Sequence, residues 1–304
     1  MPVYRLRDDR RSNSIGSRKG GWVVVTITPK TLDEALEFRS KERMIPFAGG
    51  TDLMVRRRSW SGTSPHFEYP VLFIGKLPEL KKIAVAAEDN ILAIGAGVSL
   101  TELLEHPEVP EILKQAIRVM ASPAIRNLAT LGGNICNSSP AADTLPPLTV
   151  LSATLVLQNT ASRREVPVVE FIKGPGHNDL KTDELLTAIH IPVVKNNFYF
   201  YKKVGTRKAD ALSKVSFAGL AQTSDEIITE IKIAIGAVAP RVVSSVEAEA
   251  FLKGKPISDL PKLLPELKQM YEEYIRPIDD QRSSAAYRKE VSFRLMEHFI
   301  TQLK

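Results

Sequence analysis

Two pairs of adjacent glycines constrain this chain more than any other feature. One pair lies in Ala48-Gly49-Gly50-Thr51-Asp52, after a β-type run, and the other in Thr130-Leu131-Gly132-Gly133-Asn134, after a helical stretch. Adjacent glycines permit positive φ and let backbone amides approach a ligand with no Cβ in the way. Successive amides in such a turn form a nest for phosphate oxygens. Either pair alone is more often a simple turn, but two together suit a ligand with two phosphates, such as a dinucleotide.

A third glycine-containing stretch, Ile94–Leu100, begins like a Rossmann fingerprint but has Leu100 where the third glycine belongs. We expect a strand end there, followed by a turn into a helix capped at Ser99. Asp143 follows Gly133 by ten residues. A carboxylate near a phosphate loop can accept hydrogen bonds from ribose or ribityl hydroxyls, and Asp143 can equally be the N-cap of a helix that starts at Thr144. The two roles are compatible.

The order of predicted elements divides the chain near residue 195. Capping boxes at Thr31–Glu34 and Ser99–Glu102 predict helix starts, and apolar spacing predicts another helix over 112–121. After Lys195-Asn-Asn197, three β-type runs precede three helical stretches, which is typical of an α+β domain. We therefore expect a basic segment over 1–21, a mixed domain over 22–195 and a C-terminal domain over 196–304. In the first domain the expected strands include 45–47, 83–86 and 165–169. The expected C-terminal strands are 198–204, 214–221 and 227–236, and the expected helices are 244–252, 260–274 and 284–303.

Composition excludes several classes of protein. With 43% apolar and 25% charged residues the chain is ordinary, and no run approaches the ~18 apolar residues of a membrane span. The first residues lack an apolar core typical of a secretory signal, so a cytoplasmic location is expected. The single cysteine, Cys136, excludes an iron–sulfur cluster held by this chain alone, because such clusters take about four thiolates.

Other chemistries find no support in the sequence. The five histidines show no metal-ligand spacing and no hydrolase motif occurs, so we name no catalytic and no metal-binding residue. Residues 1–21 are basic, but Asp8 and Asp9 dilute their charge, so a solvated tail is a better interpretation than a nucleic-acid arm. The basic cluster Lys202-Lys203…Arg207-Lys208 is more often a solvated face than an anion site.

The segments Pro46–Met54 and Ile125–Asp143 closely resemble the two FAD-binding segments of the medium, flavin-carrying subunits of molybdenum hydroxylases. That family includes flavin subunits of bacterial xanthine, carbon monoxide and nicotinate dehydrogenases, and the resemblance extends from about Trp22 to Arg288. It implies an α+β fold: a PCMH (vanillyl-alcohol-oxidase)-type FAD-binding domain of two α+β subdomains, followed by a domain of three antiparallel strands and three helices. By the same resemblance the FAD-binding residues are Phe47, Ala48, Gly49, Gly50, Thr51, Asp52, Leu53, Thr130, Leu131, Gly132, Gly133, Asn134, Asp143, Leu186 and Lys203.

Two departures from the family pattern matter. Some xanthine dehydrogenases place an aromatic residue against the isoalloxazine just before the Ile125-Arg126-Asn127 segment, and this chain has Met120 there. The 4-hydroxybenzoyl-CoA reductase relatives carry a cysteine-bearing cluster loop, which one cysteine cannot supply. The segment Phe171–Gly176 looks most like the xanthine and nicotinate dehydrogenase branch.

The resemblance implies an electron-transfer subunit of a heteromeric, dimerised complex. One partner subunit would carry [2Fe-2S] clusters and another the molybdopterin centre, while FAD in this chain passes electrons to an acceptor. NAD⁺ is one such acceptor, with quinone, ferredoxin and oxygen left open. The alternatives are a free-standing FAD-dependent oxidase or reductase of the same superfold and a non-catalytic scaffold or nucleic-acid-binding subunit.

Overall fold

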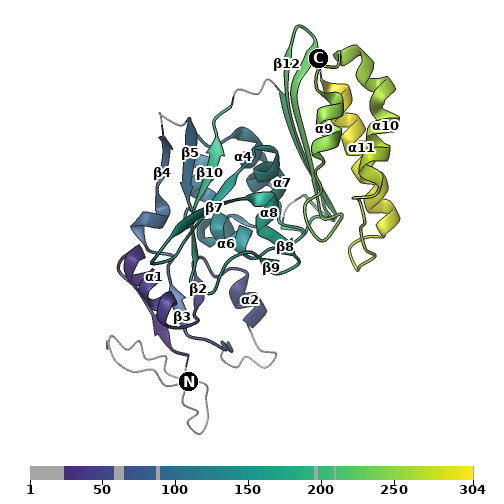
Figure 1. Cartoon of the computed structure of the whole chain (residues 1–304). Helices are drawn as coiled ribbons and strands as arrows, with labels where there is room; N and C mark the ends of the chain where they lie inside the picture. The colour runs from purple at the N-terminus through teal and green to yellow at the C-terminus, as the bar shows by residue number, and fades with distance from the viewer. Residues whose placement is uncertain (1–23, 58–64, 87–89, 195–197, 209, 304) are drawn as a thin grey trace.

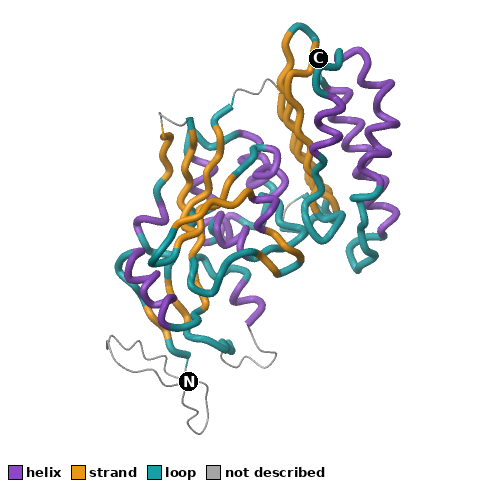
Figure 2. The backbone as a smooth tube through the Cα atoms, viewed as in Figure 1, coloured by secondary structure: helices purple, strands orange, loops and turns teal. Residues whose placement is uncertain are grey.

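The computed structural model describes residues 24–57, 65–86, 90–194, 198–208 and 210–303. The basic segment expected over 1–21 lies outside the described residues, as does Trp22. Figure 1 shows the chain as two adjoining bodies, with the C-terminal helices at the end opposite the N-terminal sheet. Figure 2 shows that strands and helices are mixed in the first body but separate into one sheet and one helical layer in the second.

The first body holds two main sheets. The small one is parallel, in the order β1-β3-β2, and the larger one is antiparallel, in the order β4-β5-β10-β6-β7. A two-stranded ribbon, β8 with β9, lies beside them. The strands are β1 Thr26–Ile27, β2 Ile45–Phe47, β3 Val71–Phe73, β4 Ile83–Ala86, β5 Ile91–Gly95, β6 Thr154–Gln158, β7 Arg163–Pro167, β8 Ile172–Gly174, β9 His177–Asn178 and β10 Leu185–Pro192.

Short helices connect these strands. Two of them begin at hydroxyl caps that the sequence predicts. The Thr31 hydroxyl accepts a hydrogen bond from the Glu34 amide, and Ser99 with Glu102 forms a complete capping box. The Glu34 carboxylate accepts from the Lys30 amide instead of from Thr31. The helices are α1 Leu32–Lys41, α2 Leu53–Arg57, α3 Leu100–Glu105, α4 Glu111–Arg118, α5 Pro123–Leu128, α6 Leu131–Cys136, α7 Leu145–Val150 and α8 Val168–Phe171, with a 3₁₀ turn η1 Pro78–Lys81.

The second body is a three-stranded antiparallel sheet, β11-β12-β13, covered on one face by helices. The sheet is buried on both faces, since Ala218 and Ala234 join the core of the first body while Phe217 and Ile235 pack under the helices. The elements are β11 Phe198–Val204, β12 Val215–Ser224, β13 Ile227–Gly236, α9 Val246–Leu252, η2 Ile257–Asp259, α10 Leu260–Glu272 and α11 Ala285–Gln302. The predicted order of three strands followed by three helices is confirmed.

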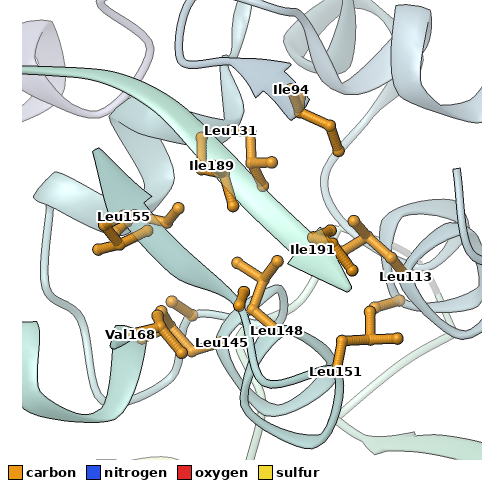
Figure 3. Packing of buried hydrophobic residues seen from close by; sticks show 14 of the residues in the cluster. Ile94, Leu113, Leu131, Leu145, Leu148, Leu151, Leu155, Val168, Ile189 and Ile191 are labelled. Carbon is orange, nitrogen blue, oxygen red and sulfur yellow. The ribbon is translucent and has the colours of Figure 1, made fainter. Parts of the chain in front are cut away.

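The largest core lies between the antiparallel sheet and the helices that cover it. Figure 3 shows Ile189 and Ile191 of β10 meeting Leu131, Leu148 and Leu113 from three helices. All five side chains are fully buried. Burying a large aliphatic side chain contributes roughly 1.5–3 kcal/mol, so this layer fixes α6 and α7 against the sheet.

Three local predictions are wrong. The helix predicted over 112–121 ends at Arg118 and is followed by a turn in which Ala121 has φ 44°. The strand predicted over 165–169 is β7, Arg163–Pro167, and Val168 already belongs to α8. Asp143 is not a helix N-cap, because α7 starts at Leu145 with Thr144 at the cap and without a capping side chain.

Candidate functional site

A cavity of about 610 Å³ opens where the two subdomains and the C-terminal domain meet. This volume lies within the roughly 300–1,000 Å³ of small-molecule and cofactor sites. The glycine segment before α2 forms one part of its wall, and the segment that begins α6 forms another. Of the residues predicted from the sequence, those in the wall are Ala48, Gly49, Gly50, Thr51, Asp52, Leu53, Thr130, Gly132, Gly133, Asn134, Asp143, Leu186 and Lys203.

Two predicted residues do not line the cavity. Leu131 is fully buried in the core and its amide donates to the Val98 carbonyl. Phe47 lies beneath the first glycine segment, where a Cβ on Gly50 would come within 2.2 Å of its ring. Both residues support the wall from behind.

The first glycine segment offers free backbone donors. Within the described part of the chain, the amides of Gly49, Gly50, Thr51 and Asp52 donate to no protein acceptor. Gly50 has φ 69°, and a Cβ on Gly49 would lie 1.9 Å from the Leu128 carbonyl oxygen. Glycine is therefore required at both positions, once for conformation and once for close approach. Four free amides beside a cavity suit an anionic ligand such as a pyrophosphate.

The second glycine segment is built differently from the positive-φ turn that the sequence predicts. Its glycines lie in the first turn of α6, and neither has a positive φ. The amide of Gly132 donates to the Ala96 carbonyl at 2.9 Å, and the amide of Gly133 donates to the Thr130 hydroxyl at 3.1 Å. Both amides already donate to acceptors within the protein. The segment therefore offers a surface that a ligand can approach closely, and not a nest of free amides. A Cβ on Gly132 would lie 2.6 Å from that of Ala96.

Asp143 is the centre of a buried cluster that joins the two bodies. Its carboxylate accepts hydrogen bonds from Lys203 at 2.7 Å, from the Tyr201 hydroxyl at 3.2 Å and from the Ser213 hydroxyl. The side chains of Asp143 and Lys203 are each only 7% exposed. Burial and the neighbouring carboxylate of Asp143 raise the pKa of Tyr201 well above its usual value, so its hydroxyl remains a neutral donor.

The structure adds wall residues that sequence reasoning missed. Asn178 lines the cavity while its amide donates to the Cys136 carbonyl and to the Ser138 hydroxyl. Asp210, Ala211 and Leu212 form part of the wall from the C-terminal domain. The alternation of β11 could have indicated Tyr201, since it lies two residues before Lys203 and shares its face. The sequence carries no comparable local signal for Asn178 or for residues 210–212.

The residues present fit FAD. Free amides and a lysine face one cavity that also has apolar walls, as a nucleotide with a flat ring system requires. The described ranges hold no group of three or more potential metal ligands. Burial raises the pKa of the Cys136 thiol to about 12, which keeps it protonated and unreactive near pH 7.

The comparison with known proteins agrees with this geometry. A sequence profile for the FAD binding domain in molybdopterin dehydrogenase matches residues 21–194, and one for the CO dehydrogenase flavoprotein C-terminal domain matches residues 199–303. The chain is 32% identical to the glyceraldehyde dehydrogenase medium chain of Sulfolobus acidocaldarius, over 87% of this chain and 92% of that one. It is also 32% identical to the nicotinate dehydrogenase FAD-subunit of Eubacterium barkeri, over 86% and 90%.

Solved structures share the fold. A reconstituted CO dehydrogenase from Oligotropha carboxidovorans matches with a TM-score of 0.83 at 23% identity, covering 93% of this chain and 98% of that one. Quinoline 2-oxidoreductase from Pseudomonas putida 86 matches with a TM-score of 0.81 at 24% identity, over 92% and 96%. None of the helices in the described ranges has the length and apolar character needed to cross a bilayer. The chain belongs to the family of FAD-binding flavoprotein subunits of the molybdopterin dehydrogenases.

Proposed function

We propose that the protein relays electrons within a molybdenum hydroxylase complex. It takes them from [2Fe-2S] clusters of one partner subunit and passes them to NAD⁺, while substrate is oxidised at the molybdopterin centre of another partner. The observation that carries this proposal is the cavity with four free amides in its wall. When bound, FAD supplies the ability to exchange single electrons on one side and an electron pair on the other.

We assign the binding of FAD to the residues predicted from the sequence. The free amides of Gly49, Gly50, Thr51 and Asp52 would hold the pyrophosphate, and the bare surface of Gly133 would let the nucleotide lie close to α6. Gly133 supports this role because a Cβ there would meet only the Thr130 hydroxyl, at 2.9 Å.

The remaining assigned residues lie around the same cavity. Leu186 of β10 is 4% exposed and contributes an apolar part of the wall. Lys203 and Asp143 line the wall as one ion pair, so the pair presents little net charge there. The ion pair can therefore contact a nucleotide without presenting a full positive charge to it.

We propose partner subunits because two relatives are named as a medium chain and as an FAD-subunit of dehydrogenases. One cysteine cannot hold a [2Fe-2S] cluster, and the described residues contain no group of metal ligands. In the xanthine dehydrogenase of Emericella nidulans the matched region is 22% of the length, so further domains share that polypeptide. We propose that separate chains supply them here, in a heteromer that dimerises. We propose a cytoplasmic location for the complex.

The test begins with the purified chain and the Gly50→Ala variant. We expect one FAD and no iron per wild-type chain, and weaker FAD binding in the variant, because a Cβ would meet the Phe47 ring at a φ of 69°. Gly254→Ala is the matched control, since Gly254 has φ 78° but no atom within 4 Å of its added Cβ. A wild-type chain that takes up no FAD, or equal FAD loss in both variants, would contradict the site.

The acceptor and the relay role need separate measurements. Anaerobic mixing with NADH should bleach the flavin absorption band of the loaded chain, and no bleaching would argue against NAD⁺. The chain alone should not oxidise xanthine, nicotinate or an aldehyde. Turnover of such a substrate by the pure chain would favour a free-standing oxidase instead.

A further inference from the structure

The turn between α4 and α5 is a strained part of the cavity wall. Met120 and Ala121 of this turn line the cavity, and Met120 is 8% exposed. Ala121 has φ 44°, in the left-handed region that residues with a Cβ rarely adopt. Such a conformation persists only where the surrounding structure holds it in place. What holds this turn is therefore part of how the cavity is built.

Two cations bind three successive carbonyls of the turn. The Arg126 guanidinium donates through Nη1 to the Met120 carbonyl at 2.7 Å and to the Ala121 carbonyl at 3.0 Å. The Lys203 ammonium donates to the Val119 carbonyl at 3.2 Å. Hydrogen bonds from charged donors are stronger than neutral ones. The turn is thus fixed from α5 on one side and from β11 of the C-terminal domain on the other.

The hydrogen bonds from Arg126 and Lys203 also decide which groups of the turn face the cavity. Arg126 does not line the cavity, so the carbonyl oxygens of Met120 and Ala121 are committed to a group outside it. What remains on the cavity side is apolar, and the Met120 thioether is a favourable partner for an aromatic ring. A ring that gains negative charge on reduction is disfavoured by carbonyl oxygens that face it.

The cavity wall near this turn is exposed to solvent, and this exposure bears on which part of FAD lies beside the turn. Ser213 and Lys203 both bond to Asp143, and Leu212, next to Ser213, lines the cavity and is 63% exposed. An electron-transferring ring needs an edge that a partner or an acceptor can reach. Resting on the function proposed above, we infer that Arg126 and Lys203 are positioning residues that hold the Val119–Ala121 turn against the isoalloxazine of bound FAD.

The decisive variant is Arg126→Gln in the full chain, with Arg118→Gln as its matched control. Arg118 is also a cation of this region, but it pairs with Glu111 at the surface and is 51% exposed. Arg126→Gln should raise the Kd for FAD about tenfold, the equivalent of one charged hydrogen bond. It should also change the visible absorption of the saturated protein, reduce the quenching of flavin fluorescence and make the flavin midpoint potential more negative. Arg118→Gln should change none of these.

Rescue separates positioning from general stability. Arg126→Lys keeps the charge and its donors, so it should recover part of the affinity and of the spectrum. A folded Arg126→Gln protein with wild-type Kd and spectrum would overturn the inference. So would a weaker Kd with unchanged saturated spectrum and potential, because the turn would then not touch the ring. A wild-type chain that binds no FAD would instead refute the proposed function.

Discussion

Removing both partners of the buried Asp143–Lys203 pair should destabilise the protein by less than the sum of the two single removals. Asp143→Leu leaves the Lys203 ammonium, 7% exposed, with only the Val119 carbonyl. It also removes the acceptor of Tyr201 and Ser213. Losing one member of a buried pair costs about 3–5 kcal/mol, and we expect a loss in this range for the free energy of unfolding.

Removing the lysine instead of the aspartate should cost less stability. In Lys203→Met the Asp143 carboxylate keeps the hydroxyls of Tyr201 and Ser213 as donors, so we expect a loss of about 1–3 kcal/mol. The double variant buries no unpaired charge. Its loss should therefore fall short of the sum of the two single losses by about 2 kcal/mol or more.

Urea denaturation of the FAD-free protein at pH 7, followed by fluorescence and by circular dichroism, measures these differences. Both probes must agree, because a chain with two bodies can unfold in two steps. The matched control is the exposed pair Glu230–Lys253, at 45% and 60% exposure, whose removal should cost no more than about 1 kcal/mol. Strictly additive effects of Asp143→Leu and Lys203→Met would refute the reasoning.

Three further predictions concern packing and pH. Gly132→Ala should cost about 1–3 kcal/mol in thermal unfolding, because its Cβ would lie 2.6 Å from that of Ala96, whereas Gly174→Ala, with no atom within 4 Å, should cost far less. Burial raises the pKa of Glu249 from 4.5 to about 6, so Glu249→Gln should stabilise the protein by about 2 kcal/mol at pH 8 and by nothing below about pH 4. A gain that persists at low pH would argue against burial as the cause. Burial by itself would raise the pKa of Asp280, but hydrogen bonds from two arginines and from backbone amides hold this pKa below its usual value. Asp280→Asn should therefore lower stability at pH 7, and the difference from wild type should narrow as pH falls below about 4.

Local chemistry explains what the sequence predicts correctly. The helix starts at Thr31 and Ser99 depend on residues within four positions of each other, and the structure has both. The strands 45–47, 83–86 and 198–204 agree to the residue, and each contains β-branched or aromatic residues that favour strands. The resemblance correctly implies the fold and the family, since it uses many segments in their order.

The errors arise where a contact from far along the chain decides the outcome. Asp143 carries a local N-cap signal, but its partners lie 58 to 70 residues away on another body. Gly132 looks like part of a turn, yet it is a glycine because Ala96 approaches it across the fold. Ala121 continues a helical pattern, but the helix ends at Arg118, and the Val119 carbonyl that follows binds Lys203, 84 residues away.

The cluster around Asp143 also bears on when the cavity forms during synthesis. Lys203 meets its partners across 60 and 84 residues of chain, and the rim at Leu212 comes later still. Domains that emerge first from the ribosome generally fold first. The glycine segments can therefore fold while the translating ribosome has yet to release Lys203, and one wall of the cavity is missing until then. Loading of the nucleotide is consequently expected only after β11 and the segment up to Leu212 have been synthesised, and a chain truncated before β11 should lack this wall of the cavity.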